Sequence, residues 1–468
     1  MITLNAALQI SANALNEDSQ AIGITGENLA NQTTPGYAAQ VVEPESDAFN
    51  LSEGLPGGVN IDTGDTRSQF AEQAVWYQQS QTGQYQAFTQ NSSPVAEVMD
   101  LNDATGSSGI LGTLNSLLQS FTSLAPSPNA TASQNAVIEN AQAFAASINS
   151  AAQTVQQTVT NAQSAAQNVV TQINQLVGVV QQYNQQIAGG VTPGATTQAQ
   201  AYAALESLSN LVPFSTHVAS DGSISILMNG GTALLSGVHQ FNLQASLVAP
   251  ASGAAYPEGN PTLEITGGQG QNVTNSITSG QLGGLINFIN NFAPTLIGNG
   301  SQQGALNQLA QGLANSVNST LGGATPLFQY GSGSPTDIAQ SLSVSSSYTS
   351  TDLSNALTAN PNAAANLAQI GAGSTPGTQI NGQSFTGFLS TAETNAAGAI
   401  DAQQSSLTQS TSLLEQAQAN RTQLQGVSLA NESVNLIQYQ EAFQASSEVI
   451  SVINQMMTDA ENMLTITT

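Results

Sequence analysis

The sequence contains no cysteine, and its basic side chains are two arginines in a chain of 468 residues. Without cysteine the chain can form no disulfide, no thiolate nucleophile and no cysteine-based metal site. Proteins that bind nucleic acid need clustered Lys and Arg, and an anionic membrane surface repels a chain with a net charge of −26. The composition therefore excludes nucleic acid and membrane surfaces as partners.

Charged residues of either sign make up 6% of the chain and aromatic residues 5%, so amide and hydroxyl side chains dominate its surface. This mixture is typical of long, slender helices with small apolar seams. The length is too great for one compact core, so we expect two or three domains.

The 28 acidic residues are almost unopposed by basic ones. Because carboxyl pKa values lie near 4, most of these groups lose their charge at roughly pH 3. Two interpretations stay open: the chain works in an acidic medium, where self-repulsion fades, or its composition has drifted without such a role.

Long apolar runs are also missing. No stretch approaches the ~18 consecutive apolar residues that a membrane-spanning helix requires. The first ten residues carry neither Lys nor Arg and no unbroken apolar run, so we expect no conventional secretory signal.

Apolar residues repeat every seven positions at both ends of the chain. The N-terminal row is Met1, Leu8, Leu15, Ile22 and Leu29, with Leu4 in the second position of the heptad. The C-terminal row is Leu436, Phe443, Ile450, Met457 and Leu464, partly complemented by Tyr439 and Ile453. Each row fills about half a seam, and such a helix is marginal on its own, so we expect the two ends to pair.

The longest regular pattern covers 135–188, where two apolar rows offset by four residues predict one long helix. Shorter helical patterns occupy 110–124 and 282–321. Between them, alternating residues and the turns Asp221-Gly222 and Asn229-Gly230 predict strands.

These patterns predict a mainly α fold with a β-rich insertion: terminal coiled-coil helices, a long helical bundle layer and outer β domains. The expected division is as follows: 1–92, N-terminal axial helix and loop; 93–211, helical bundle; 212–278, β-rich outer domain; 279–322, helical return; 323–378, Ser/Thr/Gly-rich outer insertion; 379–428, C-terminal bundle helix; 429–468, C-terminal axial helix.

Two motifs carry a resemblance to a known family. Residues 28–37, NLANQTTPGY, resemble the N-terminal signature of flagellar rod, hook and hook-associated proteins. Residues 426–429, GVSL, and 435–446, NLIQYQEAFQAS, resemble their C-terminal signature. Three features resemble the hook-associated protein 1 group in particular: the residues of the second motif, the long helical block and GQLGGL at 280–285.

This resemblance implies a structural role at the junction between hook and filament. It implies export through the flagellar type III apparatus without a cleaved signal, an extracellular location in the flagellum, and polymerisation with other copies. The partners it implies are the hook protein, the second junction protein and, before secretion, a cytosolic export chaperone. It implies no enzyme, cofactor or metal.

The candidate assembly interface combines the apolar rows with the N-terminal motif. It consists of Leu4, Leu8, Leu15, Ile22, Leu29, Pro35, Gly36 and Tyr37 at one end, and Leu436, Tyr439, Phe443, Ile450, Ile453, Met457 and Leu464 at the other.

Arg67 and Arg421 fall on family motif positions, and we expect each to pair with a carboxylate or carbonyl at a domain or subunit junction. The other interpretation is that both are solvated. His217 and His239 have no acidic residue or cysteine at metal-ligand spacing, so we expect no metal site.

Two other functions stay open. A hook or rod subunit would have β-rich sequence directly after a short first helix, and the helical block at 135–188 argues against it. A secreted adhesin would need a secretion signal or β-solenoid repeats.

Overall fold

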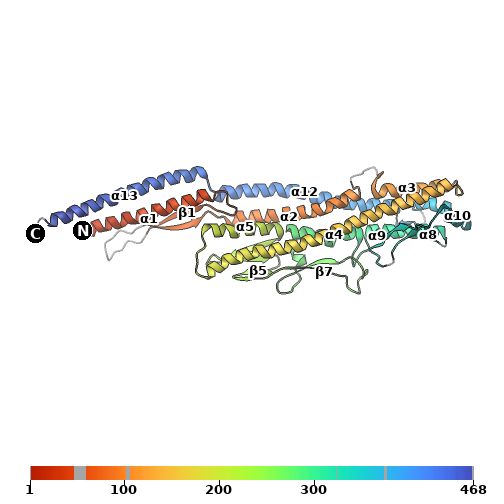
Figure 1. Ribbon diagram of the computed structural model, residues 1–468, viewed down its shortest axis with the longest axis horizontal. Helices are drawn as coiled ribbons and strands as arrows, with labels where there is room; N and C mark the ends of the chain where they lie inside the picture. The colour runs from red at the N-terminus through yellow and green to blue at the C-terminus, as the bar shows by residue number, and fades with distance from the viewer. Residues whose placement is uncertain are drawn as a thin grey trace.

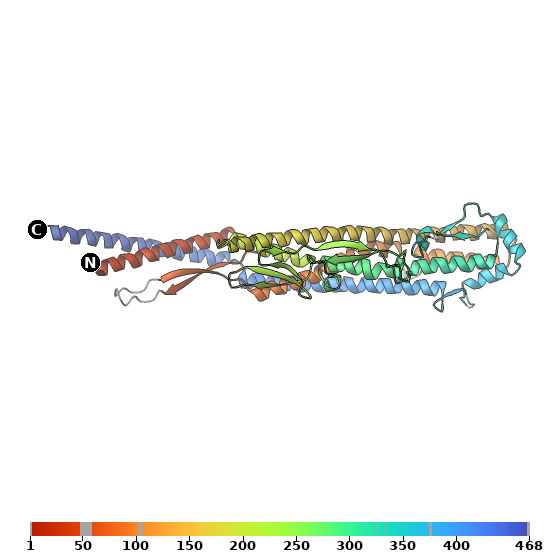
Figure 2. The same cartoon turned by 90° about the horizontal axis from the view of Figure 1, so that it is seen from below.

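The computed structural model describes residues 2–46, 59–101, 106–323, 325–331, 333–373 and 377–465. The molecule is a long rod with both ends of the chain at the same tip (Figure 1). There α1 (Ile2–Ala30) and α13 (Leu429–Thr465) lie side by side, and a bundle of helices extends away from them (Figures 1 and 2).

Six helices form the body of the bundle. They are α2 (Gln69–Val98), α3 (Gly109–Leu124), α4 (Thr131–Ala188), α5 (Ala195–Leu211), α8 (Ala305–Leu321) and α12 (Phe385–Gln425). Shorter helical segments complete it: η1 (Thr274–Ser276), α6 (Gly280–Asn287), the π-helical turn η2 (Phe288–Phe292), α7 (Ala293–Ile297), α9 (Ile338–Ser341), α10 (Ser350–Ala359) and α11 (Ala363–Ile370).

The long helix α4 organises the rod. Its 58 residues correspond to roughly 90 Å at 1.5 Å per residue. It contacts α2, α3, α5 and α8 of the bundle body. The apolar rows predicted from the sequence are buried along it, including Ile148, Val155, Ala162 and Ile173. Gly178 lies inside the helix without ending it. The predicted mainly α class with a β-rich insertion is confirmed.

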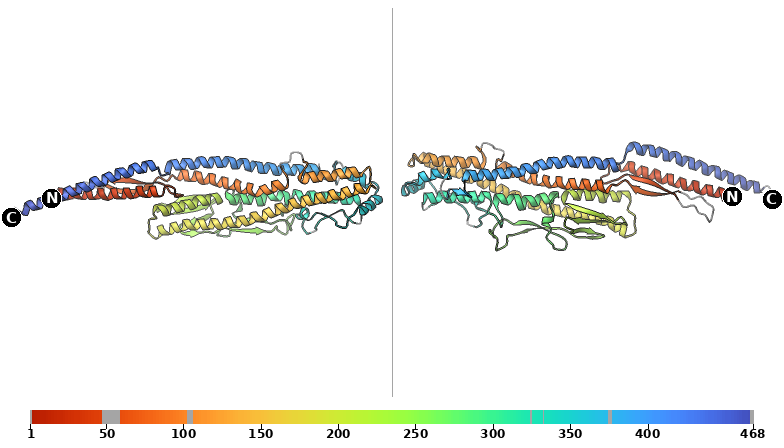
Figure 3. Two further views of the ribbon diagram at one scale, coloured as in Figure 1. Left: turned by 45° about the horizontal axis from the view of Figure 1, so that its top comes forward. Right: turned by 180° about the vertical axis from the view of Figure 1, so that it is seen from behind.

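The strands lie along the flank of the bundle, next to α4 (Figure 3). One antiparallel sheet has the order β3-β4-β5-β6 and a second pairs β7 with β8. Their bounds are β3 Phe214–Val218, β4 Ile224–Met228, β5 Ala233–Ser236, β6 His239–Gln240, β7 Gln244–Val248 and β8 Thr262–Thr266. Two-stranded sheets are formed by β1 (Gln40–Ser46) with β2 (Val59–Asp65), β9 (Phe328–Gln329) with β10 (Ser343–Val344), and β11 (Gln379–Ile380) with β12 (Gln383–Ser384).

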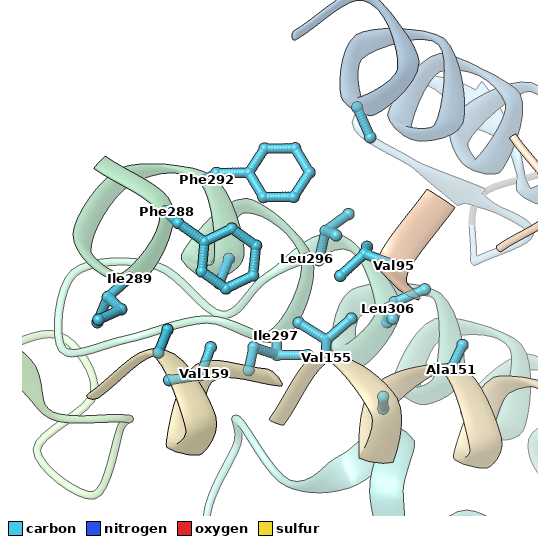
Figure 4. Close-up of a cluster of buried hydrophobic side chains, with 14 of the residues drawn as sticks. Val95, Ala151, Val155, Val159, Phe288, Ile289, Phe292, Leu296, Ile297 and Leu306 are labelled. Atoms are coloured by element: carbon cyan, nitrogen blue, oxygen red, sulfur yellow. The ribbon is translucent and has the colours of Figure 1, made fainter. Parts of the chain in front are cut away.

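A single hydrophobic core runs through helices and strands together. The inward residues of β4, Ile224, Ile226 and Met228, belong to the same cluster as the buried face of α4. Figure 4 shows its central part, where the aromatic rings of Phe288 and Phe292 lie above Val155 and Val159 of α4. Because the sheets complete this core, they add to the bundle instead of folding separately.

Asparagine side chains attach extended segments to the helices. In five places a carboxamide donates to the carbonyl and accepts from the N–H of one residue, at 2.8–3.0 Å. The pairs are Asn28 with Gln40, Asn174 with Leu243, Asn184 with Ile224, Asn290 with Leu263 and Asn318 with Phe328. A carboxamide matches a peptide group in shape and carries no charge, so this attachment needs no basic residue.

The pair at Asn184 yields a prediction. Its side chain is 1% exposed and also donates to the carbonyl of Gly237 at 2.7 Å. We expect Asn184→Leu to lower the free energy of unfolding by about 2–4 kcal/mol, because buried peptide groups of β4 and the β5–β6 turn lose their partner. Urea unfolding measures this. Asn161→Leu, at an exposed position of the same helix, is the control; an equal loss in both variants would contradict the prediction.

The sequence patterns missed two long helices and misjudged a third region. No apolar period was assigned to α2, which contains Gly83 and Pro94, or to α5, whose buried face includes several alanines, although the predicted bundle at 93–211 includes α5. The single helical pattern at 282–321 is divided into α6, η2, α7 and α8, since the chain turns between Gly298 and Gly304, both at positive φ.

The predicted outer insertion at 323–378 contributes buried residues to the common core in its described part, among them Leu353 and Leu367. The predicted boundary at residue 92 falls inside α2. The division into domains stays a prediction, but the described β-rich residues lie against the bundle. No helix in the described ranges has the length and apolar character to cross a membrane.

Candidate assembly site

The predicted apolar rows meet along the α1–α13 pair. On α1, Leu4, Leu8, Leu15, Ile22 and Leu29 are half-buried, and so are Leu436, Tyr439, Phe443, Ile450 and Met457 on α13. Ile453 is the most enclosed, with 7% of its surface exposed. The side chain of Leu464 lies outside the described residues.

Other apolar side chains of α13 point away from α1. Val434, Ile437, Val449, Val452 and Met456 are each between 47% and 57% exposed. One seam of this helix is therefore partly covered by α1, while a second apolar face stays exposed among the residues that the structure describes.

The turn after α1 is held by Asn28, which is 1% exposed. Besides its bonds to Gln40, its Oδ1 accepts from the Tyr37 hydroxyl at 2.9 Å. Burial, together with the smaller effects of the charges of Glu27 on α1 and Glu432 on α13, raises the pKa of Tyr37 to about 12. Tyr37 thus lies where the two terminal helices meet the bundle.

Both arginines of the chain converge on one carboxylate. Glu72, in the first turn of α2, is 2% exposed. Its Oε1 accepts from Arg67 Nη1 at 2.7 Å, and its Oε2 accepts from Arg421 Nη1 at 3.2 Å. We call this group, together with Glu206 and Gln425, the arginine junction.

Each arginine then reaches a further element. Arg67 Nη2 donates to the carbonyl of Gly36 at 2.8 Å, and the guanidinium lies 3.6 Å from the centre of the Tyr202 ring on α5. Arg421, near the end of α12, binds both carboxylate oxygens of Glu206 on α5, at 2.8 and 3.2 Å. The expected pairing of both arginines with carboxylates or a carbonyl is thus seen within the chain.

Gln425, the last residue of α12, closes the arginine junction. Its side chain donates to Glu72 Oε1 at 2.7 Å and accepts from the backbone N–H of Ser68 at 3.0 Å. Its carbonyl accepts from the backbone N–H of Ala39 at 3.0 Å. The arginine junction therefore ties the segment after α1, the start of α2, α5 and the end of α12 into one point.

The electrostatics of the arginine junction favour the charged form of Arg421. Burial alone lowers the pKa of Arg421, but hydrogen bonds and charges from Glu206 and Glu72 outweigh it, and the pKa is raised. The side chains of Arg67 and Glu72 are 3% and 2% exposed, so solvent screens their pairing little. This arrangement can fix the angle between the terminal helices and the bundle, and it offers no nucleophile or metal-binding geometry.

Gly36 approaches α5 closely. Its φ is +75°, and a Cβ built there would lie 2.3 Å from the carbonyl oxygen of Ala199 and 2.6 Å from the backbone nitrogen of Ala203. A residue with a side chain fits neither the backbone conformation nor the space. Pro35 beside it is exposed.

Sequence reasoning missed the acceptors of the arginine junction. Glu72, Glu206, Gln425 and Asn28 were not singled out, although two arginines among 28 acidic residues must attract carboxylates. Glu72 lies five positions after Arg67, but Glu206 is brought in by the packing of α5. His217 and His239 are exposed on β3 and β6, at opposite edges of the four-stranded sheet.

Comparison with protein families agrees with this geometry. Residues 97–327 match the family model of the helical domain of the flagellar hook-associated protein FlgK. Residues 422–463, which include Gln425 and most of α13, match the C-terminal family of flagellar basal-body rod proteins FlgEFG. Together the two matches cover more than half of the chain.

This chain belongs to the FlgK family of flagellar hook-associated proteins. None of the curated proteins matches it. Among solved structures it is similar to the flagellar hook junction protein FlgK from Burkholderia pseudomallei, with 24% identity and a TM-score of 0.45. The similarity covers 55% of this FlgK-family chain and 47% of the Burkholderia chain, so it spans about half the length of that relative.

Proposed function

We propose that this FlgK-family chain is a structural subunit of the bacterial flagellum that forms part of the junction between hook and filament. It polymerises through its paired terminal helices and does no enzymatic chemistry. The observation that carries the proposal is the α1–α13 pair, whose apolar seam is half-buried and whose second apolar face is open on α13.

The physical argument rests on incomplete burial. A helix pair with half a seam is only marginally stable with one partner, so neighbouring copies supply the missing contact area. The partners of the proposal are therefore other copies in a ring or helix, the hook protein on one side and the second junction protein on the other. Before secretion, an export chaperone covers the same apolar helices.

The arginine junction supports this role because it ties α12 and the segment after α1 to the bundle. Forces on a flagellum act on the terminal helices and must pass into the rest of the subunit. A buried, multiply bonded connection at that point resists bending better than apolar contact alone.

Electron microscopy of a strain lacking this protein tests the proposal. We expect hooks without filaments and filament protein shed into the medium, and we expect the full chain to restore filaments. Versions lacking 1–35 or 430–468 should fail to restore them. Normal filaments in the deletion strain, or restoration by either truncated chain, would contradict the proposal.

Two adjacent residues of α13 separate contacts within one chain from contacts between chains. Ile453 faces α1 and is 7% exposed, whereas Val452 is 55% exposed. We expect Ile453→Asn to weaken the pair itself, seen as lost helicity of the monomer. Val452→Asn should leave the monomer unchanged and still reduce polymerisation, because its partner lies on another copy.

A further inference from the structure

An apolar groove lies between the start of α2 and the end of α12, two helices that pack against each other. Phe70 and Tyr77 of α2 line one side, and Leu413 and Leu424 of α12 line the other. The groove has a volume of about 600 Å³, and none of the described residues that line it is charged. We call it the α2–α12 groove. An exposed apolar surface of this kind is typical of a protein-binding site.

The aromatic rings in the α2–α12 groove are unusually exposed for this chain. Phe70 is 82% exposed and Tyr77 is 62% exposed, whereas the other aromatic residues that the structure describes are buried or half-buried. Aromatic side chains are enriched where proteins contact each other, because they bury a large area on binding. An occupant of the groove would therefore remove much apolar surface from water.

The exposed face of α13 carries a row of matching character. Val449, Val452 and Met456 are spaced by three and four residues, so they lie on one side of the helix, and each is about half exposed. The sequence has no charged residue between Glu448 and Asp459. We call these three residues the α13 ridge.

The α13 ridge and the α2–α12 groove also agree in length. The first and last residues of the ridge are seven positions apart, about 10 Å along a helix, and so are Phe70 and Tyr77. Leu413 and Leu424 are eleven positions apart, or about 16 Å. An amphipathic helix binds a hydrophobic groove through an apolar row of this spacing. The ridge can thus fill the groove over about two helical turns.

The α13 ridge cannot reach the α2–α12 groove of its own chain. The groove lies on the bundle, where α2 begins and α12 ends, whereas α13 extends away from the bundle in the opposite direction (Figures 1 and 3). Val449 lies twenty positions after Leu429, the first residue of α13, which places it about 30 Å beyond the start of that helix. The ridge of one copy is therefore free to meet the groove of another.

The charge of the chain favours another copy as the occupant. Copies with a net charge of −26 repel each other, so they associate best where neither surface is charged. The α2–α12 groove and the α13 ridge both meet this condition. A partner with a strongly charged binding surface would find no counter-charge in the groove.

We propose that the α13 ridge of one copy occupies the α2–α12 groove of the next copy in the assembly. The inference rests on the proposed function and names the surfaces through which copies meet. Because two different surfaces meet, each copy offers a ridge to one neighbour and a groove to another. Contacts of this heterologous kind close into a ring or continue as a helix, as a junction of identical subunits requires.

Cysteine cross-linking tests the contact, since the unchanged chain has no cysteine. Ala417 lines the groove on α12, and Val452 is the middle residue of the ridge. The two substitutions A417C and V452C are made in one chain, and flagella from the deletion strain that carries it are isolated and oxidised. We expect a ladder of covalent oligomers under non-reducing conditions, because each chain is joined to two neighbours.

The matched control combines A419C with V452C. Ala419 is exposed on the same helix but does not line the groove, and it lies about 160° around the helix from Ala417. We expect no ladder from this control. An equal ladder from both double variants, or assembled flagella without a ladder from A417C with V452C, would overturn the inference.

The single variants identify other arrangements of the copies. We expect neither A417C alone nor V452C alone to form a cross-link. Dimers of the A417C chain would mean that groove meets groove, and dimers of the V452C chain would mean that ridge meets ridge. Either result would overturn the inference.

A second test does not depend on cysteine. F70N and Y77N together replace exposed side chains, so we expect thermal unfolding of the monomer to stay unchanged. In the deletion strain this variant should restore at least about tenfold fewer filaments than the unchanged chain. Val191→Asn is the control, because Val191 is also exposed and apolar but lies outside the groove and the ridge.

We expect the Val191→Asn chain to restore filaments fully. Full restoration by the chain with F70N and Y77N would overturn the inference and leave the proposed function standing. Normal filaments in the deletion strain itself would instead contradict the proposed function.

Discussion

Replacing Glu72 with glutamine is expected to lower the free energy of unfolding by about 3–5 kcal/mol. Both Arg67 and Arg421 contact the carboxylate of Glu72, and its side chain is 2% exposed. Glutamine keeps the size of the side chain but leaves the Arg67 guanidinium, itself 3% exposed, without its buried counter-charge. Urea unfolding of the full chain measures the loss.

Glu415→Gln is the matched control, because Glu415 is exposed on α12 and its removal changes the net charge equally. We expect that variant to change stability by less than about 0.5 kcal/mol. Arg421→Gln should lower the free energy of unfolding by less than Glu72→Gln does, since the Arg421 side chain is 18% exposed and Arg67 still pairs with Glu72 in that variant. A Glu72→Gln protein as stable as the Glu415→Gln protein would show that the arginine junction contributes nothing to stability.

Replacing Gly36 with alanine is the second large expected effect: it should lower the free energy of unfolding by about 2–5 kcal/mol. A left-handed backbone costs a residue with a Cβ about 1–2 kcal/mol, and overpacking typically adds about 1–3 kcal/mol. The new methyl group would press on the carbonyl of Ala199 and the backbone nitrogen of Ala203 on α5. To relieve this, the turn must move away from α5, which also weakens the bond from Arg67 to the Gly36 carbonyl.

Gly190→Ala separates the two contributions. Gly190 has a φ of +77°, close to the +75° of Gly36, and nothing lies within 4 Å of the position of its Cβ. Thermal unfolding of both variants should show the backbone contribution alone for Gly190 and a clearly larger loss for Gly36. Equal losses of stability would mean that the turn at Gly36 moves away from α5 without further destabilising the protein, and that the close contact with α5 is unimportant.

Long, regular patterns predicted their elements well. The rows containing Ile148, Val155 and Ile173 defined α4, because a helix buried on one face needs an apolar residue at every third or fourth position. The predicted hairpin turns at Asp221-Gly222 and Asn229-Gly230 are also confirmed. Gly222 and Gly230 both adopt a φ of +87°, a conformation that glycine allows.

Elements with weak patterns could not be predicted in the same way. The helix α2 buries residues as small and polar as Ser80, Gly83 and Ser92, so its buried face has no clear apolar period. Its helical state depends on contact with α5, α6 and α12. Tertiary packing there decides what local preference leaves open.

For the candidate site, too, the sequence predicted some features and the tertiary structure decided others. The sequence by itself determined the terminal apolar rows, the motif around Gly36 and Tyr37, and the scarcity of basic residues, because each is a local or compositional property. Only the tertiary structure decided that Arg67 and Arg421, 354 positions apart in the numbering, share Glu72, and that Glu206 and Gln425 complete the group. Hydrogen bonds between side chains act over about 3 Å and leave no periodic trace in a sequence, so the fold alone selects the partners.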